Sequence, residues 1–150
     1  MINQAIARDL LAVLCGLQGL ATLVIDLNSK HARNTTWTGH ARFHVAWQTS
    51  AFVLLAMVEI ALLFAPGPAA AQRFYLAALL AAVPMLGFFL AFLGRTLYGG
   101  QLADVNGMRP LSVRLFGMPR QIDLNLAAEV VGLLSLIVLV FLFRHAGLHR

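Results

Sequence analysis

Residues 26–48 read DLNSKHARNTTWTGHARFHVAWQ and separate two apolar runs of the chain. This stretch contains both tryptophans, the single lysine and three of the five histidines. The flanking runs, residues 10–27 and 45–65, are each long enough to cross a bilayer, since about 20 helical residues span roughly 30 Å of hydrocarbon. The polar stretch therefore predicts a loop at a membrane surface between two transmembrane helices.

Two further apolar runs follow, at residues 74–93 and 124–143. The composition is 60% hydrophobic and 11% charged, and the mean hydropathy is +0.80. A soluble bundle would need a polar face on each helix, and residues 77–91 and 130–143 have none. The sequence predicts an all-α integral membrane protein, a single domain over residues 1–150 folded as a four-helix up-down bundle, with helices at about 10–27, 40–65, 74–95 and 123–144.

The net charge of +5 is spread over helix ends and loops, where basic side chains meet lipid headgroups. It therefore indicates membrane lipid as a partner and no nucleic acid. All but one of the 11 basic residues are arginines, which favours a bacterial source and hence the bacterial inner membrane. The two long loops carry more lysine and arginine than the opposite side, which predicts that they are cytoplasmic.

Local signals predict where the helices begin and end. Thr38 is in position to cap the second helix, and Pro66-Gly67-Pro68 should stop it. Pro84 should kink the third helix and free a backbone carbonyl. Residues 111–115 alternate between apolar and polar side chains, which indicates a short strand or an interfacial segment.

Polar residues gather at the helix ends that adjoin the long loops. Helix 1 also carries Gln18, Thr22 and Asp26 at steps of four residues, which places a polar stripe along it. An up-down path brings all these ends to one level, and ionisable groups in a span are costly. We therefore expect one polar cavity at that level, into which these side chains converge: Asp26, His40, His44, Arg95, Asn125 and Glu129.

The residue types suggest roles at this level. His40 and His44 share a helix face and could act as acid–base groups beside Asp26 or Glu129. The expected ligand-binding residues are Arg95, Trp47, Gln48, Tyr98 and Asn125. His31, His40 and His44 together could hold a single divalent metal. Each assignment has a structural alternative: histidines bonded to loop carbonyls, Arg95 in a buried salt bridge, and tryptophans in an aromatic belt.

Glu59 lies in the second span, fifteen residues beyond His44 and hence about 22 Å along the helix axis. It cannot share a metal with the histidines. Two interpretations stay open: an ion pair with Arg8 or Arg73, or the deep end of the cavity.

The segment H-x-x-N-x-x-W-x-G-H-A-R-F-H, residues 31–44, resembles a pattern of uncharacterised small four-helix membrane proteins of bacteria and fungi. That family implies a four-span layout and no known activity. A more distant similarity connects the chain with the emopamil-binding sterol isomerases, which act on apolar substrates with intramembrane histidine, acid and tryptophan groups. No motif of theirs matches residue by residue, so this similarity is an analogy.

Three functions compete. The first is a membrane enzyme that acts on a lipid-like or isoprenoid substrate by proton transfer between histidine and carboxylate. The second is a subunit that binds or transports a hydrophobic small molecule, a metal or protons without catalysis. The third is a structural accessory protein, and each of the three is compatible with a homo-oligomer.

Overall fold

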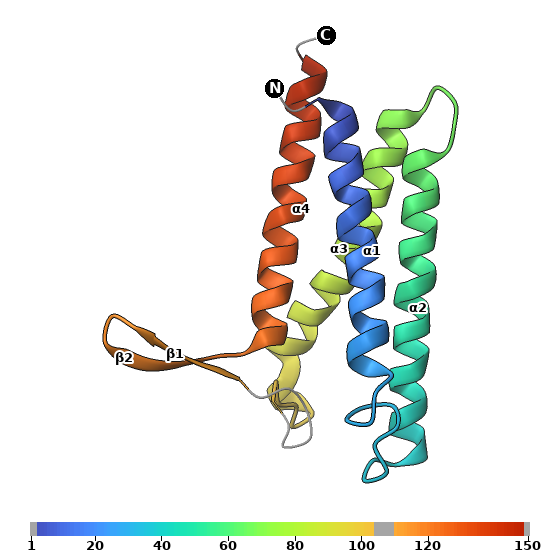
Figure 1. The fold of residues 1–150 in the computed structure, drawn as a ribbon. Helices are drawn as coiled ribbons and strands as arrows, with labels where there is room; N and C mark the ends of the chain where they lie inside the picture. Colours follow the sequence, from blue (N-terminus) through green and yellow to red (C-terminus); the bar gives the residue numbers. More distant parts are fainter. Residues whose placement is uncertain (1–2, 104–109, 149–150) are drawn as a thin grey trace.

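The computed structural model describes residues 3–103 and 110–148. Within these residues the chain forms four long helices, a short 3₁₀ turn and one antiparallel hairpin (Figure 1). The elements in chain order are α1 (Gln4–Asp26), α2 (Gly39–Phe64), α3 (Ala70–Gly94), η1 (Arg95–Leu97), β1 (Leu111–Leu115), β2 (Met118–Ile122) and α4 (Leu124–Leu148). The expected all-α class is confirmed, with the hairpin as a small addition.

Side-chain caps fix several helix starts. The Thr38 hydroxyl accepts a hydrogen bond from the Ala41 backbone N–H at 3.2 Å, as the sequence predicts. Asn3 caps α1 through the N–H of Ile6 at 2.9 Å, and Asp123 caps α4 through that of Leu126 at 2.9 Å. The helix α2 ends at Phe64, just before the proline-glycine-proline turn, and α3 continues through Pro84.

All four long helices are long and apolar enough to cross a membrane. Their apolar side chains are mostly not buried within the protein. Leu90 and Leu93 on α3 are each 72% exposed, and Phe141 on α4 is 62% exposed. Exposed apolar surface of this extent marks a region that contacts lipid or another protein.

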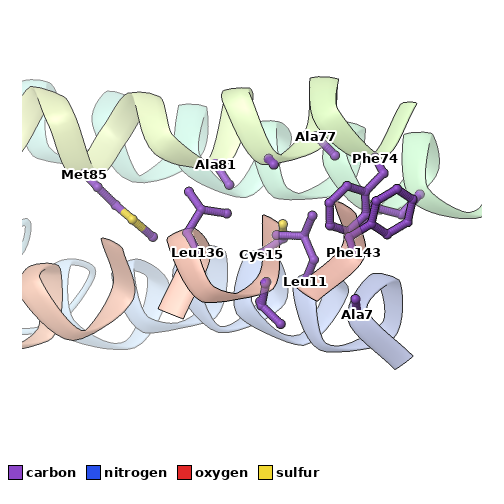
Figure 2. Close-up of a cluster of buried hydrophobic side chains, with 12 residues drawn as sticks. Ala7, Leu11, Cys15, Phe74, Ala77, Ala81, Met85, Leu136 and Phe143 are labelled. Carbon is purple, nitrogen blue, oxygen red and sulfur yellow. The ribbon is translucent and has the colours of Figure 1, made fainter. Parts of the chain in front are cut away.

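The described helices pack as neighbours in a ring: α1 against α2 and α4, and α3 against α2 and α4. Figure 1 shows both termini at one end, and the hairpin and the 27–38 loop at the other. The buried core, shown in close-up in Figure 2, is formed mainly by residues 7–15 of α1, 74–85 of α3 and 136–143 of α4. These segments lie toward the end of the bundle that carries the termini. There Phe74 of α3 stacks on Phe143 of α4 with ring centroids 3.7 Å apart, in one cluster with Leu11 and Cys15 of α1. The other half of the molecule is less completely filled.

Candidate functional site

A cavity of about 620 Å³ lies in this second half and is lined by all four long helices, mainly by α1 and α4. Apolar walls come from all four long helices, including Leu14, Phe52, Phe88 and Val131. The polar groups that line it are Gln18, Thr22, Asp26, Gln48, Asn125, Glu129 and Ser135. Its size lies within the usual range of small-molecule sites, about 300–1,000 Å³. The cavity is therefore large enough for a small organic ligand.

Helical spacing on α1 brings one set of polar groups into the cavity. Gln18, Thr22 and Asp26 follow one another at four-residue steps and so lie along one side of the helix. The Gln18 amide donates to the Ala81 carbonyl of α3 at 3.3 Å, in the turn before Pro84. The Thr22 hydroxyl donates to its own helix at the Gly19 carbonyl, 2.8 Å away. This stripe holds α1 to α3 and leaves Asp26 at the cavity's loop end.

A second set comes from the start of α4. Asn125 and Glu129 are four residues apart, and Ser135 follows further along the same cavity wall. Glu129 is half-buried, and among the described residues its carboxyl group has no hydrogen-bond or ion-pair partner. Asp26, by contrast, lies beside the Thr49 hydroxyl and interacts electrostatically with His31. Two carboxyl groups from different helices therefore face one cavity in different surroundings.

The charge of the cavity is one-sided. None of the described residues that line it is a lysine, an arginine or a histidine. Carboxyl groups beside apolar walls are poorly solvated, and a compensating cation or hydrogen-bond donor would stabilise them. The arrangement suits a ligand with a positive charge or several donor groups.

The histidine pair lies outside the cavity. Both rings are exposed on the first turns of α2, and their Nε2 atoms are 3.0 Å apart. His44 packs beside Trp47, whose side chain is 60% exposed. The expected convergence of His40 and His44 with Asp26 and Glu129 is therefore not found. The orientation of α2 about its own axis directs the pair to the surface, while Gln48 and Phe52 of the same helix line the cavity.

The three-histidine metal group is not assembled either. His31 packs edge-to-face on Trp37, with ring centroids 5.7 Å apart, and it lies near Asp26. Across residues 3–103 and 110–148, no three histidine, cysteine or acidic side chains come together in a way that could hold a metal ion. His40 and His44 therefore lie side by side without a third ligand among the described residues.

The remaining expected ligand-binding residues divide between the cavity and the helix end. Gln48 and Asn125 line the cavity as predicted. Arg95 donates to the Phe92 carbonyl at 2.7 Å, and its guanidinium lies over the Phe92 ring, 4.3 Å from the centroid. Tyr98 donates to the Ala91 carbonyl at 2.7 Å. Arg95 and Tyr98 thus complete the end of α3 and do not line the cavity.

Glu59 is a third acid, away from the cavity lining. It is 1% exposed, and neither of its carboxylate oxygens has a hydrogen-bond partner among the described residues. The Cys15 thiol of α1 lies close to its carboxyl group. Arg8 pairs with Asp9 at 2.7 Å, and Arg73 donates to the Ala65 and Gly67 carbonyls. Neither sequence interpretation, the ion pair or the deep end of the cavity, matches this position.

Three polar residues of the cavity were not assigned a functional role from the sequence: Gln18, Thr22 and Ser135. The four-residue spacing of Gln18 and Thr22 with Asp26 is a signal that could have assigned them. Ser135 lies inside an apolar run, and nothing in the sequence distinguishes it from a serine that bonds its own helix.

No protein-family model, curated protein or solved structure matches the chain. The function is therefore inferred from the cavity itself.

Proposed function

We propose that the chain is a multi-pass membrane protein, an up-down bundle of four spans, which binds a lipophilic cation in the cavity lined by the four helices. The observation that carries the proposal is the pairing of Asp26 and Glu129 with apolar walls and no basic residue among the described lining. A protonated amine on a hydrocarbon body matches both features. Its membrane would be the bacterial inner membrane, with the long loops in the cytoplasm.

The physical basis is the cost of a carboxylate in apolar surroundings. Asp26 and Glu129 are each more stable as charged groups when a cation lies close to them. The amides of Gln18, Gln48 and Asn125 add carbonyl oxygens that accept from an ammonium group. Leu14, Phe52 and Phe88 would meanwhile cover the hydrocarbon part of the ligand. A neutral hydrocarbon would leave Glu129 without a partner among the described residues.

A second candidate is the enzyme that transfers protons on a lipid-like or isoprenoid substrate. It is favoured by one observation: Asp26 interacts with His31, whereas Glu129 has no described partner. Two carboxyl groups in different surroundings can divide the roles of acid and base. In this enzyme His31, and not the exposed pair at the start of α2, would be the proton-transfer partner of the Asp26 carboxylate.

Binding of a fluorescent long-chain alkylamine to the detergent-purified protein tests the proposal. We expect Asp26→Asn and Glu129→Gln each to raise the dissociation constant about tenfold, equal to about 1.4 kcal/mol, because each removes one counter-charge. The acetylated form of the same probe, which is neutral, should bind weakly to all variants. Fluorescence titration gives the constants.

The matched control is Asp9→Asn, which removes an exposed acid at the opposite end of α1. It should leave the affinity for the amine unchanged. Equal affinity of the amine and acetylated probes for the unaltered chain would contradict the proposal. So would unchanged amine affinity in the Asp26→Asn/Glu129→Gln double variant.

A further inference from the structure

The hairpin of β1 and β2 has an unusual tip. Leu115 pairs with Met118 across a turn formed by Phe116 and Gly117, and both turn residues have positive φ, 51° and 78°. Such turns favour asparagine, aspartate or glycine, because a bulky side chain is strained there. Phe116 is nevertheless present, and it is 97% exposed. A strained, exposed aromatic residue at a loop tip calls for a partner outside the described fold.

The two faces of the hairpin differ in polarity. On one face Ser112 lies opposite Gln121, whose amide donates to the serine hydroxyl at 2.9 Å. The other face carries Leu111 opposite Ile122 and Val113 opposite Arg120. Leu111 is 51% exposed, so this apolar face is not covered by the helices. The hairpin is therefore amphipathic, and the described part of the chain leaves much of its apolar face exposed, with Leu111 at 51% and Met118 at 52%.

The position of the hairpin relative to the helices identifies what covers that face. Figure 1 shows it extending sideways from the lower end of α4, away from the other helices. The candidate span α4 begins at Leu124, immediately after β2 and the Asp123 cap. A segment that leaves the end of a span and runs across its axis lies at the level of the lipid headgroups.

The charge of the hairpin is complementary to that surface. Arg120 lies on the apolar face and Arg114 on the face of Ser112. Both are exposed, and residues 110–122 contain no acidic residue. Arginine binds phosphate through a planar fork of donors, and its stem can lie along apolar surface while the charge reaches water. Anionic lipid attracts such basic segments.

We propose that this hairpin is a membrane-surface anchor, with Phe116 and the apolar face inserted at the boundary of the acyl chains and with Arg114 and Arg120 on anionic lipid phosphates. The partner is the bilayer that the helices cross. Strand and turn side chains would then be covered by lipid in the same way as the outer surfaces of the four helices. The anchor rests on the proposal that the four helices cross a bilayer, and it is independent of the ligand of the cavity.

Spin labels report the depth of the hairpin in reconstituted liposomes. In a Cys15→Ala background, nitroxides attached in Met118→Cys and Ser112→Cys sample the apolar and polar faces, and both variants keep Phe116. With phosphatidylglycerol in phosphatidylcholine, the label at 118 should meet oxygen more often than a water-soluble nickel complex. Its depth should be about 5 Å or more below the phosphates. The label at 112 should prefer the nickel complex.

Three comparisons decide the outcome. Omitting phosphatidylglycerol, or introducing Arg114→Gln with Arg120→Gln, should move the label at 118 toward water, and Phe116→Ser should do so in either lipid. A label at 118 that is as accessible to nickel as the label at 112, with and without anionic lipid, would overturn the proposal. Insertion that is unaffected by anionic lipid and by both arginine changes would overturn the assignment of the arginines to phosphate.

Discussion

Gly19→Ala should lower the free energy of unfolding by about 1–3 kcal/mol, the usual cost of forcing an extra methyl group into a filled contact. An added Cβ at Gly19 would lie 2.9 Å from the Ala56 Cβ and 3.6 Å from the Val53 Cα. Neither atom belongs to a flexible side-chain end, so α1 and α2 would have to separate. Small residues permit such close helix approach in membranes, where apolar burial does not itself drive association.

Equilibrium unfolding in mixed micelles, followed by far-ultraviolet circular dichroism, measures this loss. The matched control is Gly16→Ala on the same helix, whose added Cβ would meet Ile60 at an ordinary 3.9 Å. It should leave stability unchanged or raise it slightly, because alanine favours the helix. Ala56→Gly should restore part of the stability of Gly19→Ala, since it removes the colliding atom. Equal effects of the two glycine changes would contradict the close contact.

The helices were largely predictable from local signals, and their ends were less so. The apolar runs, the Thr38 cap and the stop at Pro66 each predict what the structure shows. The helix α1 starts at Gln4, well before the predicted residue 10, and α4 continues to Leu148 beyond the predicted 144. Hydropathy locates the segment that lipid can cover, whereas a helix extends past it as long as caps and backbone bonds allow.

The sequence predicted the level along the spans at which the cavity lies, but not which side chains face into it. Asp26 and Glu129 were expected at one level from the up-down path, and both line the cavity there. The histidine pair was expected at the same level but faces outward. A helix such as α2 that is apolar on all sides carries no sequence signal for its rotation about its own axis. Depth follows from position along a span, while facing depends on packing with the other helices.

Glu59 shows the same limit for ion pairs. The sequence places Arg8 and Arg73 near its end of the bundle, and both basic groups find other partners: Asp9 for one, and the backbone carbonyls of the α2–α3 turn for the other. Arginines at a membrane boundary have many acceptors within reach, including lipid phosphates. A buried acid that is packed against another helix has few hydrogen-bond donors within reach.

Glu59→Met should raise the free energy of unfolding by about 1–3 kcal/mol, the cost of a buried polar group that lacks its hydrogen bonds. Both carboxylate oxygens are buried without a partner among the described residues, and the side chain lies against Cys15 in the contact between α1 and α2. Methionine has a similar length and fills irregular space without adding polar atoms. The measurement is the same unfolding titration in mixed micelles.

The control that separates polarity from shape is Glu59→Gln, which keeps the outline of the side chain and leaves an amide in the unpaired site. It should not reproduce the gain of Glu59→Met, because the amide still lacks partners. A loss of stability in both variants would contradict the expectation. In that case the protein must stabilise the carboxyl group itself. If the group contributed only a desolvation penalty, removing it would raise the free energy of unfolding.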